Sequence, residues 1–360
     1  MPEISTIRDV AERAGVSTGT VSNFLNDTKP IAPRTRARID EAITELRFVP
    51  NHASRVMRGE RTAAVAFIVS DAPDPFFNEV ARGIEDVARE AGHVLVLCNT
   101  GGVLSVEKQY VKALAAMRVA GAIVVPAFAG RDESHLNQLR DSGGTIVLLG
   151  ADPGEYDTCC VSVDDVRGGQ LALEHLVSLG HRSFVFVGGP GGERQMRDRL
   201  AGAQLALNEA GLDSALLRRV DAAGVSIAAR AEVGERLAVL RRRPTAIFCA
   251  SDSLALAVAG SFSRLGIRVP DDIAIVGYNN IDQSELAPIP ITTIAIPQYE
   301  MGRTAAQLLL SEFIPGHEHS QTTFQPRLVA RASTLGSPGV RSAQAGSAPE
   351  SPGMSGDSRR

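Results

Sequence analysis

The sequence lacks the features that would place it in or across a membrane. Its 360 residues contain no apolar run close to the ~18 residues that a membrane-spanning helix needs. No signal-peptide pattern is present, because the first residues lead directly into a polar, capped helical segment. We therefore expect a cytoplasmic protein with no membrane partner.

The four cysteines show neither a CxxC motif nor a Cys/His spacing that is typical of a metal site: Cys98, Cys159, Cys160 and Cys249. Adjacent cysteines in a strand point to opposite faces, so Cys159 and Cys160 are a poor metal-binding pair. We expect buried, reduced thiols, no metal site and no cofactor.

Enzyme motifs are also missing. The chain has no GxSxG and no Walker loop, and the run Gly188–Gly192 contains a proline and lacks the GxGxxG order. His93, His175 and His181 are scattered and are interpreted as structural. The sequence therefore does not predict an enzyme.

Positive charge is concentrated near the N-terminus. The formal net charge of the whole chain is -4, yet residues 1–60 hold nine Lys/Arg and eight Asp/Glu, and residues 28–58 hold seven and three. Because contact with phosphates requires local positive charge, any nucleic-acid surface is expected within the first sixty residues.

Residues 5–47 predict three short helices. Thr6 and Asp9 form a capping pattern, Gly15 permits a tight turn, and Ser17 can cap a second helix. Helix, glycine turn and helix make a helix-turn-helix, whose second helix would present small polar side chains to base edges. A plain three-helix bundle is the alternative that this pattern leaves open.

From Ala63 onward, apolar strand-length runs alternate with amphipathic helical segments in two series. This pattern predicts an α/β protein in which the three-helix head precedes two doubly wound, parallel-sheet lobes of periplasmic-binding-protein type. The boundaries are predicted as follows: head 1–48, hinge helix 49–60, first lobe 61–161 with 292–324, second lobe 162–291 with 325–334, and a disordered tail 335–360.

The order of motifs resembles the LacI/GalR family of bacterial transcription regulators. The resemblance extends to about Thr334, and the segments that carry it are Thr6–Ser17, Thr20–Ser22, Leu25–Asn26, Leu46–Asn51, Asp74–Phe77, Val163–Asp165, Gly168–Gly169, His175–Leu176, Leu179–Arg182, Val276–Tyr278 and Thr292–Ile294.

The resemblance implies DNA contacts in the head and in a hinge helix that enters the minor groove. Asn23 stands where many members have Arg, which favours adenine over guanine in the operator. Met57 replaces the usual Leu as the side chain that wedges between base pairs. The implied DNA-binding residues are Thr6, Ser17, Thr18, Gly19, Thr20, Ser22, Asn23, Asn26, Asn51, Ala53, Ser54, Arg55 and Met57.

The resemblance also implies an effector site in the cleft between the lobes. The implied effector-binding residues are Asp71, Phe76, Phe77, Arg199, Ser251 and Asn279. Several positions depart from the usual family pattern: Ser251 replaces Asn, Asn279 replaces Asp and Ile296 replaces Gln. Ala222 lies near a position that is aromatic in many sugar-sensing members, and the chain has no Trp.

Together these patterns predict a sequence-specific DNA-binding regulator, with a repressor favoured. It would bind a near-palindromic operator in double-stranded DNA as a homodimer, with a tetramer as the alternative. A small-molecule effector, with carbohydrates as the first candidates, would control DNA affinity. Two rivals are a solute-binding protein of a transport system, which would lack the head, and a sugar-modifying enzyme, which would need paired acids or a nucleophile in the cleft.

Overall fold

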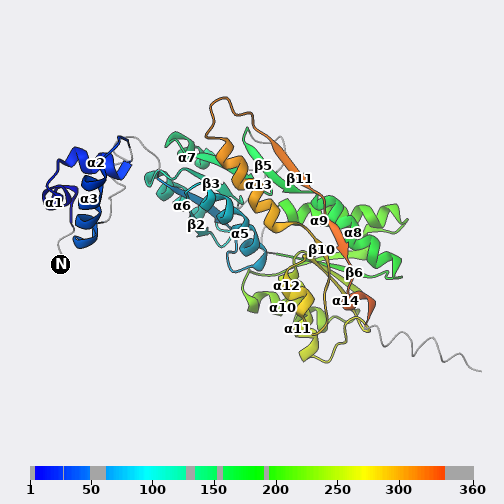
Figure 1. The fold of residues 1–360 in the computed structure, drawn as a ribbon. Coiled ribbons are helices and arrows are strands. Elements are labelled where there is room, and N and C mark those ends of the chain that lie inside the picture. Colours follow the sequence, from blue (N-terminus) through cyan, green and yellow to red (C-terminus); the bar gives the residue numbers. More distant parts are fainter. Residues whose placement is uncertain are drawn as a thin grey trace, which may run out of the picture. The chain divides into compact units, whose positions relative to one another are not determined.

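The chain divides into two compact units, residues 1–62 and 63–360. The computed structural model describes residues 5–26, 28–48, 62–126, 134–151, 157–189 and 194–336 (Figure 1). The predicted hinge helix 49–60 lies outside the described residues. Residues 337–360 of the predicted tail also lie outside the described residues. Leu335 was assigned to that tail, but it ends helix α14 (Ala332–Leu335).

The first unit contains the three predicted helices, α1 (Ile7–Ala14), α2 (Thr18–Asn26) and α3 (Pro33–Glu45). Thr6 and Asp9 form a reciprocal capping box at the start of α1, and Gly15 ends that helix in the left-handed conformation with φ 61°. The Arg38 guanidinium of α3 donates to the carbonyls of Ala14 and Gly15 and so fixes the turn. The apolar faces meet in a small core: Val10, Ala11, Ala14, Val21, Ile39, Ala42 and Phe48.

The second unit contains two six-stranded sheets. The first sheet has the order β11-β5-β4-β3-β1-β2, and all its pairs are parallel. Its strands are β1 (Ala64–Val69), β2 (Val94–Asn99), β3 (Gly121–Val124), β4 (Thr145–Leu149), β5 (Cys159–Val163) and β11 (Gln321–Phe324).

The second sheet has the order β12-β10-β9-β8-β6-β7, and only the β12–β10 pair is antiparallel. Its strands are β6 (Phe184–Gly188), β7 (Leu217–Asp221), β8 (Ala246–Cys249), β9 (Ala274–Asn279), β10 (Thr292–Ala295) and β12 (Arg327–Val329). Central strands such as β1, β6 and β9 are buried along their whole length, which explains their continuous apolar sequences.

Helices cover both faces of each sheet (Figure 1). In the first lobe, α5 (Pro75–Glu90) and α13 (Gln298–Ser311) pack together, while α6 (Leu104–Ala116), η1 (Ser134–Leu136) and α7 (Asn137–Asp141) form a separate apolar layer. In the second lobe, α8 (Asp165–Ser178) packs on α9 (Arg194–Glu209), and α10 (Ile227–Ala238) packs on α11 (Asp252–Arg264). The short elements are η2 (Ser214–Leu216) and α12 (Asp282–Leu286).

Glycines allow α8 and α9 to approach with backbone against backbone. A Cβ on Gly202 would meet the Val166 carbonyl oxygen and lie 3.0 Å from the Gln170 nitrogen, and a Cβ on Gly169 would collide with the Arg199 carbonyl oxygen. This close contact sets the distance between the start of α8 and the first turns of α9.

The chain crosses between lobes later than the sequence indicated. Thr292–Ala295 was assigned to the first lobe, but β10 pairs with β9 and β12 in the second sheet. β5 likewise continues to Val163 in the first sheet, two residues beyond the predicted boundary. Apolar strands look alike in either lobe, so the sequence pattern does not specify which sheet a strand joins. α13 and β11 then return to the first lobe, where β11 lies beside β5 (Figure 1).

Candidate functional site

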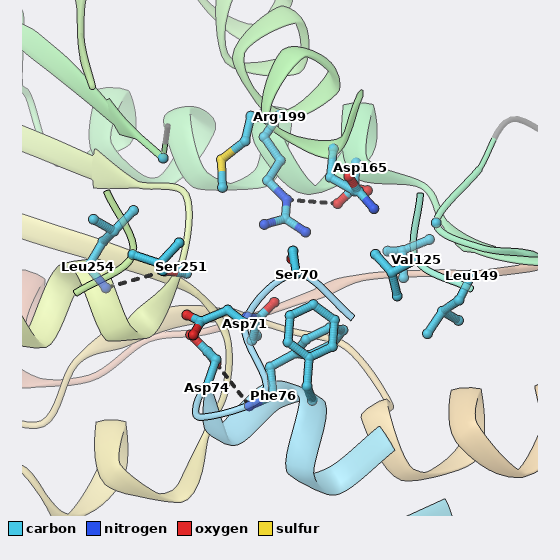
Figure 2. A pocket seen from close by; sticks show the side chains of 18 of the residues that line it. Ser70, Asp71, Asp74, Phe76, Val125, Leu149, Asp165, Arg199, Ser251 and Leu254 are labelled. Carbon is cyan, nitrogen blue, oxygen red and sulfur yellow. Dashed lines mark hydrogen bonds and ion pairs between the residues drawn. The ribbon is translucent and has the colours of Figure 1, made fainter. Parts of the chain in front are cut away.

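A pocket lies in the second unit, where the carboxyl ends of strands from both sheets face each other. It encloses about 1020 Å³ of space free of protein atoms, part of it open to solvent. The structure brings together all six residues that were expected to bind an effector, since each lines this pocket: Asp71, Phe76, Phe77, Arg199, Ser251 and Asn279. Four of them, Asp71, Phe76, Arg199 and Ser251, are labelled in Figure 2.

Arg199 enters the pocket from α9 and is held rigidly by its neighbours. Its Nε donates to Asp165 Oδ1 at 2.8 Å and its Nη1 donates to the Ala250 carbonyl at 2.6 Å. The guanidinium carbon lies 3.6 Å from the centre of the Tyr278 ring, a cation–π contact. Figure 2 shows the guanidinium directed into the pocket, with Ser70 and Phe76 on the opposite side.

Arg199 keeps its positive charge although it is buried. Burial lowers its pKa, but the Asp165 carboxylate and Tyr278 outweigh this effect, and the net pKa is raised. Burial and then Asp165 raise the pKa of Tyr278, whose hydroxyl donates to Asp165 Oδ1 at 2.8 Å. Gly168 leaves room for this phenol, because a Cβ there would collide with its oxygen. The pocket therefore keeps a fixed positive charge with forked donors.

Asn279 lines the pocket and carries a buried side-chain acceptor without a protein partner among the described residues. It ends β9 at φ 107°, a conformation that residues other than glycine rarely adopt. Gln298 Nε2 donates to its backbone carbonyl, which ties the strand end to α13. Its side-chain Oδ1 is buried and has no partner within the described structure. A buried acceptor without a donor is costly, so a ligand N–H or O–H would relieve that cost.

Asp71 takes part in an ion pair between the lobes. The residue follows β1 in the first lobe, and its carboxylate accepts from Nη2 of Arg230, which lies on α10 of the second lobe. Asp74 Oδ2 lies 3.5 Å from the same nitrogen. Burial raises the pKa of Asp71, with Arg230 opposing that shift and Asp74 adding to it. In this arrangement the Asp71 carboxylate is bound to Arg230. It therefore does not act in the pocket as a free hydrogen-bond acceptor.

Ser251 and the two phenylalanines form other parts of the wall. Ser251 Oγ caps α11 by accepting from the Leu254 nitrogen at 3.2 Å. The rings of Phe76 and Phe77 meet edge to face with centroids 4.9 Å apart. These two residues are the aromatic side chains among the described lining residues, and Ile296, Leu149 and further aliphatic residues continue the apolar surface.

Asp252 anchors the loops beneath the pocket. It is fully buried, and its carboxylate accepts from the Thr293 hydroxyl at 2.6 Å and from the Ile281 nitrogen at 2.9 Å. Burial raises its pKa to about 6. These contacts connect the ends of β8, β9 and β10, and therefore help to hold Asn279 in place.

In the first unit, the predicted base-reading residues lie at the start of α2. Ser17 Oγ accepts from the Thr20 nitrogen at 3.1 Å and so caps this helix, whereas Thr18 and Gly19 are exposed. Asn23 is half-buried, and its Oδ1 accepts from the Thr28 hydroxyl at 3.0 Å. Thr20 and Ser22 are also partly exposed, and Thr6 caps α1.

Some expected DNA contacts lie outside the described residues. Of Asn26 only the backbone is described, at the end of α2. The hinge positions are not described at all: Asn51, Ala53, Ser54, Arg55 and Met57.

Comparison with known proteins finds a matching family for each of the two units of the chain. Residues 6–51 match the bacterial regulatory proteins of the lacI family, and residues 173–334 match a periplasmic binding protein-like domain. The "HTH-type transcriptional repressor PurR" of Photobacterium profundum is 33% identical over 332 residues, which cover 92% of this chain and 98% of that protein. A repressor of the same name from Aliivibrio salmonicida is 33% identical over 333 residues, covering 92% and 99%.

The chain belongs to the LacI family.

Solved structures support this LacI family membership. The Lac repressor dimer bound to operator and the anti-inducer ONPF matches with a TM-score of 0.76 and 25% identity, covering 92% of this chain and 99% of that one. The transcriptional regulator CelR in its cellobiose complex matches with a TM-score of 0.66 and 30% identity, covering 91% and 99%. The predicted fold class is thereby confirmed, and the chain is a DNA-binding transcription regulator controlled by a small molecule.

The two relatives named above are transcriptional repressors, and the matched family is one of bacterial regulatory proteins. Within the described residues, no helix is both long and apolar enough to cross a membrane.

The residues that hold the predicted effector-binding side chains in position were not identified from the sequence. Asp165 directly follows the helix-capping Asp164, so this pair of acids after β5 was a usable signal. Arg230 offered no such signal, because it is one of two arginines on helix α10 and nothing in the sequence distinguishes it from Arg236. Asp252 follows Ser251 at the start of α11, where an acid is also explained by the helix dipole.

Proposed function

We propose that this chain is a repressor that binds a near-palindromic operator as a homodimer and responds to an effector bound between its lobes. The observation that carries the effector site is the combination of the fixed Arg199 guanidinium and the unpartnered Asn279 Oδ1 on the walls of one pocket. The DNA-facing residues proposed within the described head are Thr6, Ser17, Thr18, Gly19, Thr20, Ser22 and Asn23.

The pocket chemistry defines the kind of effector. Arg199 supplies donors for hydroxyl, carbonyl or carboxylate oxygens, and Asn279 supplies an acceptor for an N–H or O–H. Phe76 and its aliphatic neighbours supply an apolar surface, on which one face of a ring can pack. We infer a small, polar, ring-containing metabolite with a donor group and an acceptor group on different edges.

Related structures guide the choice of test ligands. A LacI family regulator from Enterococcus faecium, with a TM-score of 0.69 and 29% identity, was solved with bound ribose, and CelR was solved with cellobiose. Carbohydrates are therefore the first compounds to test, with nucleosides and polyols as the next group. A pocket without tryptophan favours ligands that rely on hydrogen bonds more than on ring stacking.

The effector proposal is tested by thermal shift of the full chain with ribose, cellobiose, nucleosides and polyols, followed by calorimetry on any compound that raises the melting temperature. Asn279→Gly removes the acceptor and keeps a residue that tolerates φ 107°. We expect its effector affinity to fall by roughly tenfold or more, as the loss of a buried hydrogen bond predicts.

Asn280→Gly is the matched control, because Asn280 also has a positive φ of 60° but its Oδ1 accepts from Arg331. It does not belong to the described pocket lining and should keep effector affinity. Equal affinity in the Asn279 variant and the parent would remove this residue from the site.

The DNA proposal is tested by selecting genomic fragments at physiological salt and measuring the symmetry of the bound sequences. We expect two inverted half-sites and a steep decrease of affinity with salt. Replacement of Asn23 by Arg should change the preferred base at one symmetric pair of positions. An unchanged preference would show that Asn23 does not read bases.

A further inference from the structure

Four potential metal ligands converge at the edge of the first sheet, away from the effector pocket. Cys159 begins β5, Glu312 follows the last residue of α13, and His317 and His319 lie on the segment that leads into β11. One ligand atom from each residue lies within 4.8 Å of all the others.

The separations within this group agree with a common tetrahedral centre. His317 Nε2 lies 3.0 Å from Cys159 Sγ and 3.8 Å from Glu312 Oε1. His319 Nδ1 lies 3.0 Å from Glu312 Oε1 and 4.0 Å from Cys159 Sγ. Metal–sulfur bonds of ~2.3 Å and metal–nitrogen bonds of ~2.0 Å place tetrahedral ligand atoms roughly 3.5 Å apart.

The local chain explains why these four side chains meet. Gly316 turns the chain at φ 81°, and His317 and His319 are two residues apart in the segment that approaches strand β11, so they can lie on one side. β11 pairs with β5 in parallel, and the Ser320 carbonyl accepts from the Cys160 nitrogen at 3.0 Å, which places the segment beside Cys159.

The charge balance favours a cation. Cys159 is fully buried, and the side chain of Glu312 is only 12% exposed. Within the described part of the chain, the ion pairs of Glu312 are with these two histidines, and no Lys or Arg joins them. A carboxylate shielded from water without a permanent positive partner is stabilised by a bound metal ion.

We propose that Cys159, Glu312, His317 and His319 form a closed, four-ligand site for a borderline transition-metal cation, with Zn²⁺ as the expected ion. One thiolate, two imidazoles and one carboxylate are the ligand types that zinc takes from proteins, and four protein ligands leave no open position for chemistry. The ion would join the end of α13, the start of β5 and the approach to β11, and so stabilise the first lobe.

This proposal replaces the expectation of no metal site, which considered CxxC and Cys/His spacings and the adjacent pair Cys159 and Cys160. Cys160 does point away, since its thiol donates to the Ala151 carbonyl at 3.5 Å. The partners of Cys159 come instead from about 150 residues later in the sequence.

The test uses the full chain, stripped with a chelator and then titrated with Zn²⁺ alone. We expect one Zn²⁺ bound per chain and a higher melting temperature with the ion. Co²⁺ in its place should give the visible bands of a tetrahedral centre and a near-ultraviolet band from sulfur-to-cobalt charge transfer.

Cys159→Ser and His319→Gln should each lose stoichiometric zinc, and Cys159→Ser should also lose the sulfur-to-cobalt band. Cys160→Ser is the matched control and should bind like the parent. His319 is about one-third exposed, so its replacement is expected to leave a folded chain in which a loss of metal is meaningful. A chain that binds no stoichiometric zinc, or keeps full binding in both variants, would overturn the proposal.

Discussion

Arg199 keeps its orientation through partners that belong to the protein rather than to the effector. Asp165, Tyr278 and the Ala250 carbonyl fix it before any ligand arrives, which lowers the entropy cost of binding. Replacing Arg199 by Ala would leave Asp165 buried without its cation, and breaking such a pair destabilises a protein by about 3–5 kcal/mol. Asn279 is therefore the better residue for probing effector recognition, since its side-chain oxygen has no protein partner to lose.

Asp252 predicts a specific dependence of stability on pH. Its pKa is about 6 in the folded chain, against an unfolded value of about 3.9, so the folded state binds more protons between those values. The free energy of unfolding should therefore decrease as the pH rises from about 4 to about 6, and remain lower above this range. Asp252→Asn removes this step, which is worth on the order of 3 kcal/mol, as urea unfolding across that pH range would measure.

Thr293→Val provides an independent check on the same carboxyl. The Thr293 hydroxyl donates to Asp252 and lowers its pKa, so its removal should move the decrease in stability to higher pH. Parallel pH profiles for the parent and Asp252→Asn would show that Asp252 does not titrate in this range.

At the scale of elements, the pair α8 and α9 determines the geometry of the pocket wall. Asp165 starts α8 and Arg199 lies in the second turn of α9, so their 2.8 Å hydrogen bond depends on the backbone contact at Gly169 and Gly202. Backbone atoms cannot move aside as the end of a flexible side chain can. A small change in this contact is therefore passed on to Arg199.

Gly202→Ala should destabilise the core by about 1–3 kcal/mol, as overpacking does, and weaken the effector response. Gly260→Ala is the matched control within a helix, because the nearest atom to a Cβ there is Arg264 Nη1 at 3.8 Å. That change should stabilise the chain by about 0.5–1 kcal/mol through helix propensity. Urea unfolding of both variants measures whether each change raises or lowers the free energy of unfolding. A stabilised Gly202→Ala variant would contradict the close contact between α8 and α9.

At the scale of the whole molecule, the type and order of the helices and strands could be predicted better than the segments that become neighbours in the folded chain. The alternation of apolar runs and amphipathic helices predicted the two lobes, because local patterns encode it. The pocket residues were predicted by the resemblance to the LacI/GalR family. Long-range pairing was not encoded locally. The sheet assignment of Thr292–Ala295, the Asp71–Arg230 pair and the approach of His317 to Cys159 each depend on segments that meet only after folding.

The Asp71–Arg230 contact makes the relation between the lobes sensitive to a single charge. Arg230 bridges Asp71 and Asp74 across the pocket, and burial of these groups strengthens the attraction relative to a surface pair. Arg230→Met would remove the attraction between α10 of the second lobe and the Asp71 and Asp74 carboxylates of the first lobe, which favours separation of the lobes. An effector that needs both walls would then bind only to the fraction of molecules whose lobes are together, and its apparent affinity would fall by that fraction.

We therefore expect Arg230→Met to increase the radius of gyration of the ligand-free chain in small-angle scattering and to weaken effector binding by several-fold. Arg219→Met is the control, because Arg219 pairs with Asp221 on β7 within one lobe. Linkage adds a second requirement: the factor by which effector changes operator affinity must equal the factor by which operator changes effector affinity, in the parent and in each variant. If Arg230→Met and Arg219→Met both match the parent in scattering and effector affinity, the ion pair does not control the lobes.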